Sequence, residues 1–120
     1  MPIHFVPQGF VPPEMTKRRP VVVVSTRQHQ RPAHETIVIV APFSTARPAR
    51  PEPHHVRIPA GTYQFLNRRV DSWIKGDMIS AVSLTRLSRL SSASLSHDHF
   101  RDVQRAVLHA LGFTQLTALV

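Results

Sequence analysis

Cysteine is absent from this sequence of 120 residues. Disulfide bonds, thiolate nucleophiles and cysteine-based zinc sites are therefore excluded. No apolar run approaches the roughly 18 residues that a membrane-spanning helix needs. The opening MPIHFVPQGF has neither a basic leader nor an apolar segment of signal-peptide length. We therefore expect a soluble, cytoplasmic protein whose chemistry uses hydroxyl, carboxylate, imidazole or guanidinium groups.

Lysine and acidic residues are scarce. Lys17 and Lys75 are the only lysines, and 15 basic residues against 7 acidic ones give a net charge of +8. Arginine thus carries almost all the positive charge, and its planar guanidinium pairs with phosphate through two hydrogen bonds and stacks on bases. This composition favours a nucleic acid as the partner over a membrane surface. The alternative is a basic surface that is merely solvated.

The remaining composition indicates one folded domain. Hydrophobic residues make up 42% of the chain and charged residues 18%, which is enough apolar material for a core. A chain of this length suits a single domain, which we expect to span residues 1–120. Five of the 11 prolines fall within the first 20 residues, so residues 1–12 are predicted to form an irregular N-terminal arm.

Apolar, β-branched runs predict that the middle of the chain is β-sheet. VVVVS (residues 21–25) and TIVIVAPF (residues 36–43) each suit a strand buried on both faces, and we expect the two strands to be neighbours. HHVRI (residues 54–58) predicts a short third strand. SWIKGDMISAV (residues 72–82) predicts either one bent strand or two short strands hinged near Gly76.

Two helical segments are predicted after these strands. LTRLSRL (residues 84–90) has leucines at intervals of three, which suits one short helical turn. A longer amphipathic helix is expected to begin at Ser96, which can cap it, and to end before Gly112. The predicted fold class is therefore mainly β with short helices (α+β), including a C-terminal amphipathic helix.

Charge is concentrated in PEMTKRRP (residues 13–20), at the entrance of the first buried strand. Pro20 fixes its own φ angle and biases Arg19 toward extended geometry, so the Arg19 side chain leaves from a stiff backbone. Fixed positive charge of this kind stabilises a reactive phosphate. Ser44 and Thr45 lie at the end of the next buried strand. If the two strands are neighbours, a hydroxyl and the guanidinium can meet at one phosphate.

Taken together, PEM-x-K-x-RPVVV, the strand TIVIVAPFST, and WIKGDMISAV followed by LTRL resemble the MazF/PemK family of toxin endoribonucleases, over roughly residues 12–112. The resemblance implies a small, strongly curved, SH3-like β-barrel that works as a homodimer. It also implies the toxin of a type II toxin-antitoxin system, an mRNA interferase that cleaves single-stranded RNA without a metal or other cofactor. A cognate antitoxin protein would hold it in check.

Carried over residue by residue, the resemblance places the essential arginine on Arg19 and its acidic neighbour on Glu14. The catalytic hydroxyl falls on Ser44, with Thr45 beside it as a second candidate. The implied reaction is attack of the RNA 2′-OH on the adjacent phosphate, which leaves a 2′,3′-cyclic phosphate and a 5′-OH. Arg19 would stabilise the developing charge, and Glu14 would either orient Arg19 or act as the base.

One departure from the family pattern supports a second hypothesis. The strand that usually precedes the acidic residue is matched here by no more than HFV, so we expect it to be shortened or lost. The chain would then be a catalytically silent RNA-binding or protein-interaction module with a MazF-like barrel. A third hypothesis, DNA binding, would require no 2′-OH.

Basic residues near these segments are the candidate RNA contacts: Lys17, Arg18, Arg27, Arg47, Arg50 and His54. No metal site is expected. Adjacent residues on a strand point to opposite faces, so His54 and His55 are not a ready-made chelate. His97 and His99 do not share a helix face either.

Overall fold

The computed structural model describes residues 2–6, 19–25, 32 and 36–120, and for residues 2–6, 19 and 88–93 the description covers the backbone alone. Within these residues the chain forms seven strands, one α-helix and three segments of 3-10 helix. The strands are β1 (Pro2–Val6), β2 (Arg19–Val23), β3 (Ile37–Ser44), β4 (His55–Ile58), β5 (Ser72–Lys75), β6 (Ser80–Ser83) and β7 (Ser88–Ser94). The helical segments are η3 (Gly76–Met78), η4 (Leu84–Arg86), α1 (His97–Ala110) and η5 (Thr114–Leu119).

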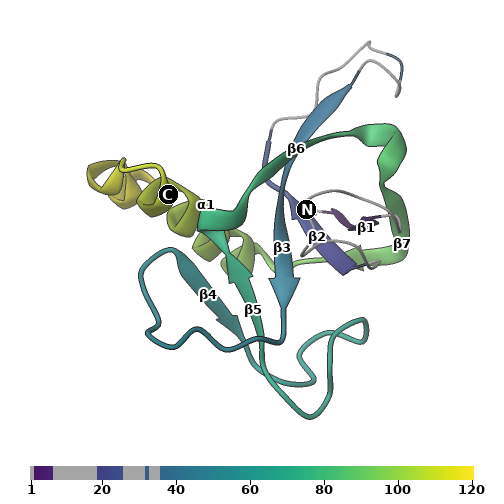
Figure 1. Cartoon of the computed structure of the whole chain (residues 1–120), viewed down its shortest axis with the longest axis horizontal. Helices are drawn as coiled ribbons and strands as arrows, with labels where there is room; N and C mark the ends of the chain where they lie inside the picture. Colours follow the sequence, from purple (N-terminus) through teal and green to yellow (C-terminus); the bar gives the residue numbers. More distant parts are fainter. Residues whose placement is uncertain (1, 7–18, 26–31, 33–35) are drawn as a thin grey trace.

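The seven strands form one antiparallel sheet in the order β4-β5-β3-β2-β1-β7, with β6 paired to β3. Figure 1 shows β3 running through the middle of the molecule, with the β4–β5 pair and α1 to one side and β1, β2 and β7 to the other. The described strands pair along an open path. The predicted fold class, mainly β with short helices and a C-terminal amphipathic helix, is confirmed.

Strands β2 and β3 lie inside the sheet because their valines can be buried on both faces. Val21 and Val23 belong to one hydrophobic cluster, and Val22 between them belongs to the other, as alternation along a strand requires. The larger cluster lies between the sheet and α1, and the helix contributes Val103 and Ala106 to it. The predicted neighbouring strands and the predicted apolar helix face are both confirmed.

Gly76 divides the segment between residues 72 and 83. Strand β5 ends before it and β6 begins after η3, so the prediction of two short strands is the correct one of the two alternatives. A Cβ atom built on Gly76 would lie 2.9 Å from the backbone carbon and oxygen of Ala106 and 3.0 Å from the His54 oxygen. Glycine therefore permits α1 to approach the sheet at this hinge.

Helix α1 begins as predicted. The backbone N–H of His99 donates to the Ser96 hydroxyl (3.2 Å), which caps the helix. The predicted helical turn over residues 84–90 ends at Arg86, and the chain continues as β7 because Ser88 onward pairs with β1. Among the described residues, no helix combines the length and the apolar character needed to cross a membrane.

The prediction of an irregular arm over residues 1–12 is wrong for residues 2–6. Pro2–Val6 forms strand β1, which pairs with β2 on one edge and with β7 on the other. Proline disfavours the interior of a strand, but Pro2 is the first residue of β1 and Ile3–Val6 has no further proline. The strand expected to be shortened or lost ahead of Glu14 is therefore present, with five residues. Residues 7–12 lie outside the described part of the chain.

Candidate active site

A pocket of about 170 Å³ lies where the start of β2, the end of β3 and the loop between β4 and β5 come together. Two aromatic side chains, three hydroxyls and one carboxamide belong to its lining. These residues come from β2 (Pro20), from β3 and the turn after it (Phe43, Ser44, Thr45), from the loop (Phe65, Leu66, Asn67) and from β5 (Ser72). The pocket therefore combines flat apolar walls with several hydrogen-bonding groups.

The start of β2 and the end of β3 meet at this pocket. Strands β2 and β3 are antiparallel neighbours in which Val21 is opposite Pro42. Pro20 at the start of β2 lines the same pocket as Ser44 and Thr45 at the end of β3, so the two strand ends lie side by side there. The predicted meeting of these two strand ends is confirmed. The contact of the Arg19 side chain with a hydroxyl stays a prediction, since that side chain is outside the description.

The two candidate hydroxyls differ in how they are held. The Ser44 hydroxyl accepts a hydrogen bond from the backbone N–H of Ala46 (3.1 Å), which fixes its oxygen and leaves its hydrogen free to donate. Thr45 is exposed and makes no hydrogen bond to other described residues. Ser44 is thus the better oriented of the two, and both line the pocket.

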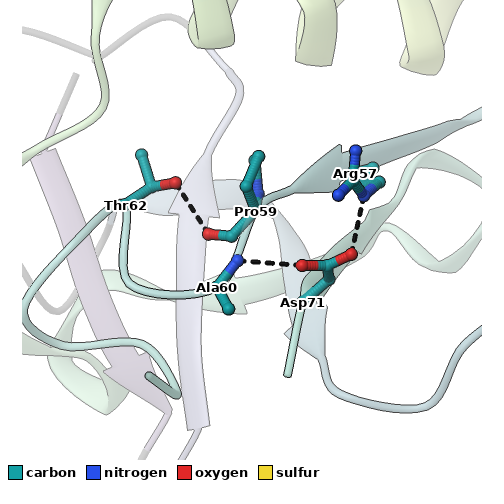
Figure 2. A network of polar contacts seen from close by, with 5 residues as sticks. All are labelled: Arg57, Pro59, Ala60, Thr62 and Asp71. Carbon is teal, nitrogen blue, oxygen red and sulfur yellow. Dashed lines mark hydrogen bonds and ion pairs between the residues drawn. The ribbon is translucent and has the colours of Figure 1, made fainter. Parts of the chain in front are cut away.

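Polar contacts clamp the two ends of the loop over residues 59–71. Figure 2 shows the Asp71 carboxylate accepting from Arg57 Nε (2.6 Å) and from the backbone N–H of Ala60 (2.9 Å). Thr62 Oγ1 donates to the carbonyl of Pro59 (2.7 Å) in the same view. The hydrogen bond from Arg57 and then that from Ala60 lower the pKa of Asp71 below its ordinary value. The carboxylate therefore remains charged and holds both ends of the loop.

Asn67 organises the middle of the loop. Its side-chain oxygen accepts from the backbone N–H groups of Arg69 (2.7 Å) and Val70 (3.1 Å). Its backbone carbonyl accepts from Gly61 N–H (3.1 Å). Asparagine is common in turns for this reason, and that preference is the one sequence signal that marks it. Our sequence reasoning missed Asn67, along with Phe65 and Ser72.

Aromatic contacts join the loop to the sheet and to α1. The Phe65 ring meets Phe43 edge to face at 5.9 Å and stacks on Tyr63 at 5.3 Å. The Tyr63 hydroxyl lies 2.7 Å from His99 Nδ1 and accepts from the backbone N–H of Ser96 (2.9 Å). The pocket wall is therefore supported from behind by the start of the helix.

The predicted RNA contacts fall into two groups. Lys17, Arg18 and Arg27, together with the predicted catalytic residue Glu14, lie outside the described residues. Arg47 and Arg50 are exposed on the loop that follows β3, and Arg47 lies close enough to Asp71 to help lower the pKa of that carboxyl. Sequence reasoning missed exposed arginines on the neighbouring segments, namely Arg57, Arg68 and Arg69.

His54 is not among the described residues that line the pocket. It is half-buried, and its Nε2 lies 3.5 Å from Asp77 Oδ2. Because β4 begins at His55, His54 precedes the strand, and alternation does not separate the two rings, whose centroids are 4.2 Å apart. Donor atoms of His54, His55 and Asp77 lie within 4.8 Å of one another.

This cluster is not ready to bind a metal ion in the form seen. His55 Nδ1 accepts a hydrogen bond from the backbone N–H of Glu52 (3.0 Å), so in the neutral ring the hydrogen is on Nε2. To coordinate a metal ion, Nε2 of His55 would have to lose its hydrogen, or Nδ1 would have to lose the hydrogen bond from Glu52. Partial burial, with a smaller contribution from His54, lowers the pKa of His55. The absence of a metal site stays a prediction.

The fold is shared with solved structures of small proteins. The structure of an endoribonuclease in complex with its cognate antitoxin from a mycobacterial species aligns with a TM-score of 0.64 and 18% identity, over 92% of this chain and 91% of that one. The Mycobacterium tuberculosis toxin MazF-mt6 aligns with a TM-score of 0.61 and 23% identity, over 93% and 97% of the two chains. At these identities the likeness establishes the fold.

The sequence then identifies the family. The profile of the PemK-like, MazF-like toxins of type II toxin-antitoxin systems matches residues 3–111, and the chain belongs to this family. The YifN protein of Escherichia coli (strain K12) is 31% identical over 119 residues, covering 90% of this chain and 76% of that protein. An uncharacterized protein of Haemophilus influenzae is 29% identical, covering 90% and 78%. The resemblance drawn from the sequence is confirmed.

Proposed function

We propose that the protein is a cytoplasmic toxin that cleaves single-stranded RNA, mRNA included, without a metal ion. Membership of the PemK-like, MazF-like family supports this function. The observation that carries it is the pocket that Ser44 and Thr45 line together with Pro20, because Pro20 directly follows Arg19 in β2. A guanidinium and a hydroxyl at one site suit a phosphodiester.

The reaction we propose is an internal displacement at phosphorus. The 2′-oxygen of one ribose attacks the adjacent phosphate and the bond from phosphorus to the 5′-oxygen breaks, which yields a 2′,3′-cyclic phosphate and a 5′-OH. The 2′-OH proton passes to a base, for which Glu14 is the candidate, and the departing 5′-oxygen takes up a proton from water. DNA has no 2′-OH and cannot follow this route.

Arg19 would act through charge rather than as an acid. A guanidinium group is a poor proton donor, so Arg19 keeps its proton and stabilises the negative charge that develops on the phosphate oxygens. The Ser44 hydroxyl, whose oxygen is fixed by Ala46 N–H, would donate to one of those oxygens, with Thr45 as the alternative donor. Glu14 would orient Arg19 if it is not the base.

The net charge of +8 supports both partners in this proposal. Exposed arginines such as Arg47 and Arg50 would contact the RNA backbone. An acidic segment of a cognate antitoxin would cover the same surface and neutralise it. The likeness to an endoribonuclease bound to its antitoxin supports such a partner, and we extend the proposal to a homodimer, as the family resemblance implies.

The test is cleavage of a long single-stranded RNA by the purified full-length protein in the presence of EDTA. We expect discrete fragments that end in a 2′,3′-cyclic phosphate. Arg19→Ala should lower the rate of cleavage at least about a hundredfold, because one preorganised charge at a transition state contributes on that order. Arg101→Ala, a matched loss of one arginine on helix α1, should cleave like the wild type. RNA that is bound but never cut would instead support the silent module.

A further inference from the structure

The carboxamide of Asn67 is fixed by one of its two ends. The backbone N–H groups of Arg69 and Val70 both donate to its side chain, at 2.7 and 3.1 Å. Only the oxygen can accept them, so these two bonds settle which end of the amide is which and occupy both lone pairs of the oxygen. The amide nitrogen has no hydrogen-bond partner among the described residues. Asn67 is therefore a rigid group that can donate and cannot accept.

Asn67 lines a pocket whose size suits a single base. The cavity of 170 Å³ is smaller than the roughly 300–1,000 Å³ of pockets for drug-sized ligands. Phe43 and Phe65 contribute aromatic surface, and their edge-to-face contact at 5.9 Å holds the Phe65 ring in place. Unstacked RNA bases bind proteins by packing on aromatic side chains and by hydrogen bonds along their edges. Ser44 and Thr45 line the same cavity, so a base bound there lies beside the proposed cleavage site.

We propose that Asn67 selects the base next to the cleaved bond, and that it favours the keto bases uracil and guanine over the amino bases adenine and cytosine. Uracil O4 and guanine O6 accept a hydrogen bond at the position where cytosine N4 and adenine N6 donate one. A free carboxamide would pair with adenine through both of its ends, but the oxygen of Asn67 is already occupied. This inference rests on the proposed function, because it assigns the specificity of the same site.

Asn67→Asp separates this role from a structural one. The carboxylate keeps an oxygen for the N–H groups of Arg69 and Val70, so the loop retains its hydrogen bonds. The group presented to the base changes from a donor to an acceptor, which suits the amino groups of adenine and cytosine. Added negative charge will weaken the binding of every RNA, and for this reason the readout is the ratio between bases rather than the overall rate.

The experiment uses a pool of short single-stranded RNAs with random sequence, cut by the full-length protein and sequenced at the new ends. The wild type should prefer uracil or guanine at one position beside the cut, by about tenfold over adenine and cytosine. Asn67→Asp should reduce that ratio at least about fivefold or reverse it. Gln64→Ala, an exposed residue of the same loop outside the described pocket lining, should leave the ratio unchanged.

Failure of this inference can be told apart from failure of the proposed function. If the wild type cuts but prefers adenine or cytosine on both sides of the cut, or if Asn67→Asp leaves the ratio as it was, the role of Asn67 is wrong and the nuclease stands. If no RNA is cut, the nuclease is wrong. Binding then decides on Asn67: oligouridylate should bind the wild type more tightly than oligoadenylate, and Asn67→Asp should narrow or invert that difference. Equal changes for both oligonucleotides would overturn the inference.

Discussion

A single carboxylate links the pocket loop to the sheet at two points. Asp71, next to the start of β5, accepts from the Arg57 side chain on β4 and from the backbone N–H of Ala60 at the start of the loop. The middle of this loop carries Phe65 and Asn67 into the pocket. Loss of Asp71 should therefore affect cleavage through the position of the loop, although Asp71 itself does not line the pocket.

Asp71→Asn should also change how stability depends on pH. The pKa of Asp71 is lowered from its ordinary 3.8, so the folded state favours the charged carboxylate. Its contribution to stability is present above that ordinary value and is lost as the pH falls through the lower pKa of the folded protein. The melting temperature of the wild type should exceed that of Asp71→Asn at neutral pH, and the difference should shrink in acid. A difference that is the same at neutral and acid pH would contradict this account.

At the residue scale, sequence alone could identify the groups at strand ends but not those of the loop. Arg19, Ser44 and Thr45 follow from two apolar runs that had to be neighbours, and the structure places those strand ends side by side. Asn67 and Phe65 lie in a segment without periodicity. Their place in the pocket depends on contacts with distant residues such as Asp71 and Phe43, which no local pattern contains.

At the scale of secondary-structure elements, the backbone of α1 lies close against the hinge between β5 and β6. Gly76 donates its backbone N–H to the His54 carbonyl (2.8 Å), and the helix backbone at Ala106 occupies the space that a Cβ would need. Sequence analysis placed a hinge at this glycine, since glycine within a strand pattern marks a bend or a close approach. It could not show which element makes that approach.

Gly76→Ala should destabilise the protein by about 1–3 kcal/mol, because the new methyl group would lie 2.9 Å from helix backbone atoms that must move away. The free energy of unfolding in urea measures this loss. The clash involves the backbone of Ala106 rather than its side chain, so adding Ala106→Gly should not restore stability. The account would be contradicted if the double variant regained the wild-type free energy of unfolding, or if Gly76→Ala left that free energy unchanged. Either result would show that the helix backbone at Ala106 lies farther from Gly76 than described.

The proline content of the N-terminal segment did not predict strand β1. Prolines within the first 20 residues predicted an irregular arm, yet only Pro2 lies within residues 2–6, and it begins the strand. The pairing of β1 with β7 adds the last strand at one edge of the sheet and comes from residues more than eighty positions apart, for example Phe5 with Ser88. The silent module was considered because this strand was expected to be shortened or lost, and the presence of β1 excludes its loss.

At the scale of the whole molecule, the excess of arginine should govern RNA affinity. For single strands, each neutralised phosphate contributes about 0.7 to the slope of log affinity against log salt. Replacing both Arg47 and Arg50 by alanine should reduce that slope by about 1.4 if each contacts one phosphate. Binding of 2′-O-methyl RNA, which cannot be cut by the proposed route, measures it. Arg101→Ala is the control and should leave the slope unchanged.

An unchanged slope in the double variant would place the RNA elsewhere on the surface, with Arg57, Arg68 and Arg69 as the remaining described arginines near the pocket loop. The net charge was evident from the sequence, but its distribution was not. Arg47 and Arg50 lie before β4, Arg57 lies on it, and Arg68 and Arg69 lie after it. The two loops become neighbours only when β4 and β5 pair and Arg47 comes near Asp71.

The most direct test of the account is a pair of short single-stranded RNAs that differ by one atom. Once the cut is mapped, the ribose on the 5′ side of that bond is replaced by 2′-deoxyribose, and both strands are incubated with the wild-type protein in EDTA and analysed by mass spectrometry. The account predicts that the all-ribose strand yields a cyclic phosphate and that the deoxy strand is bound but stays intact at that bond. Cleavage of the deoxy strand at the same bond would contradict internal attack by the 2′-oxygen.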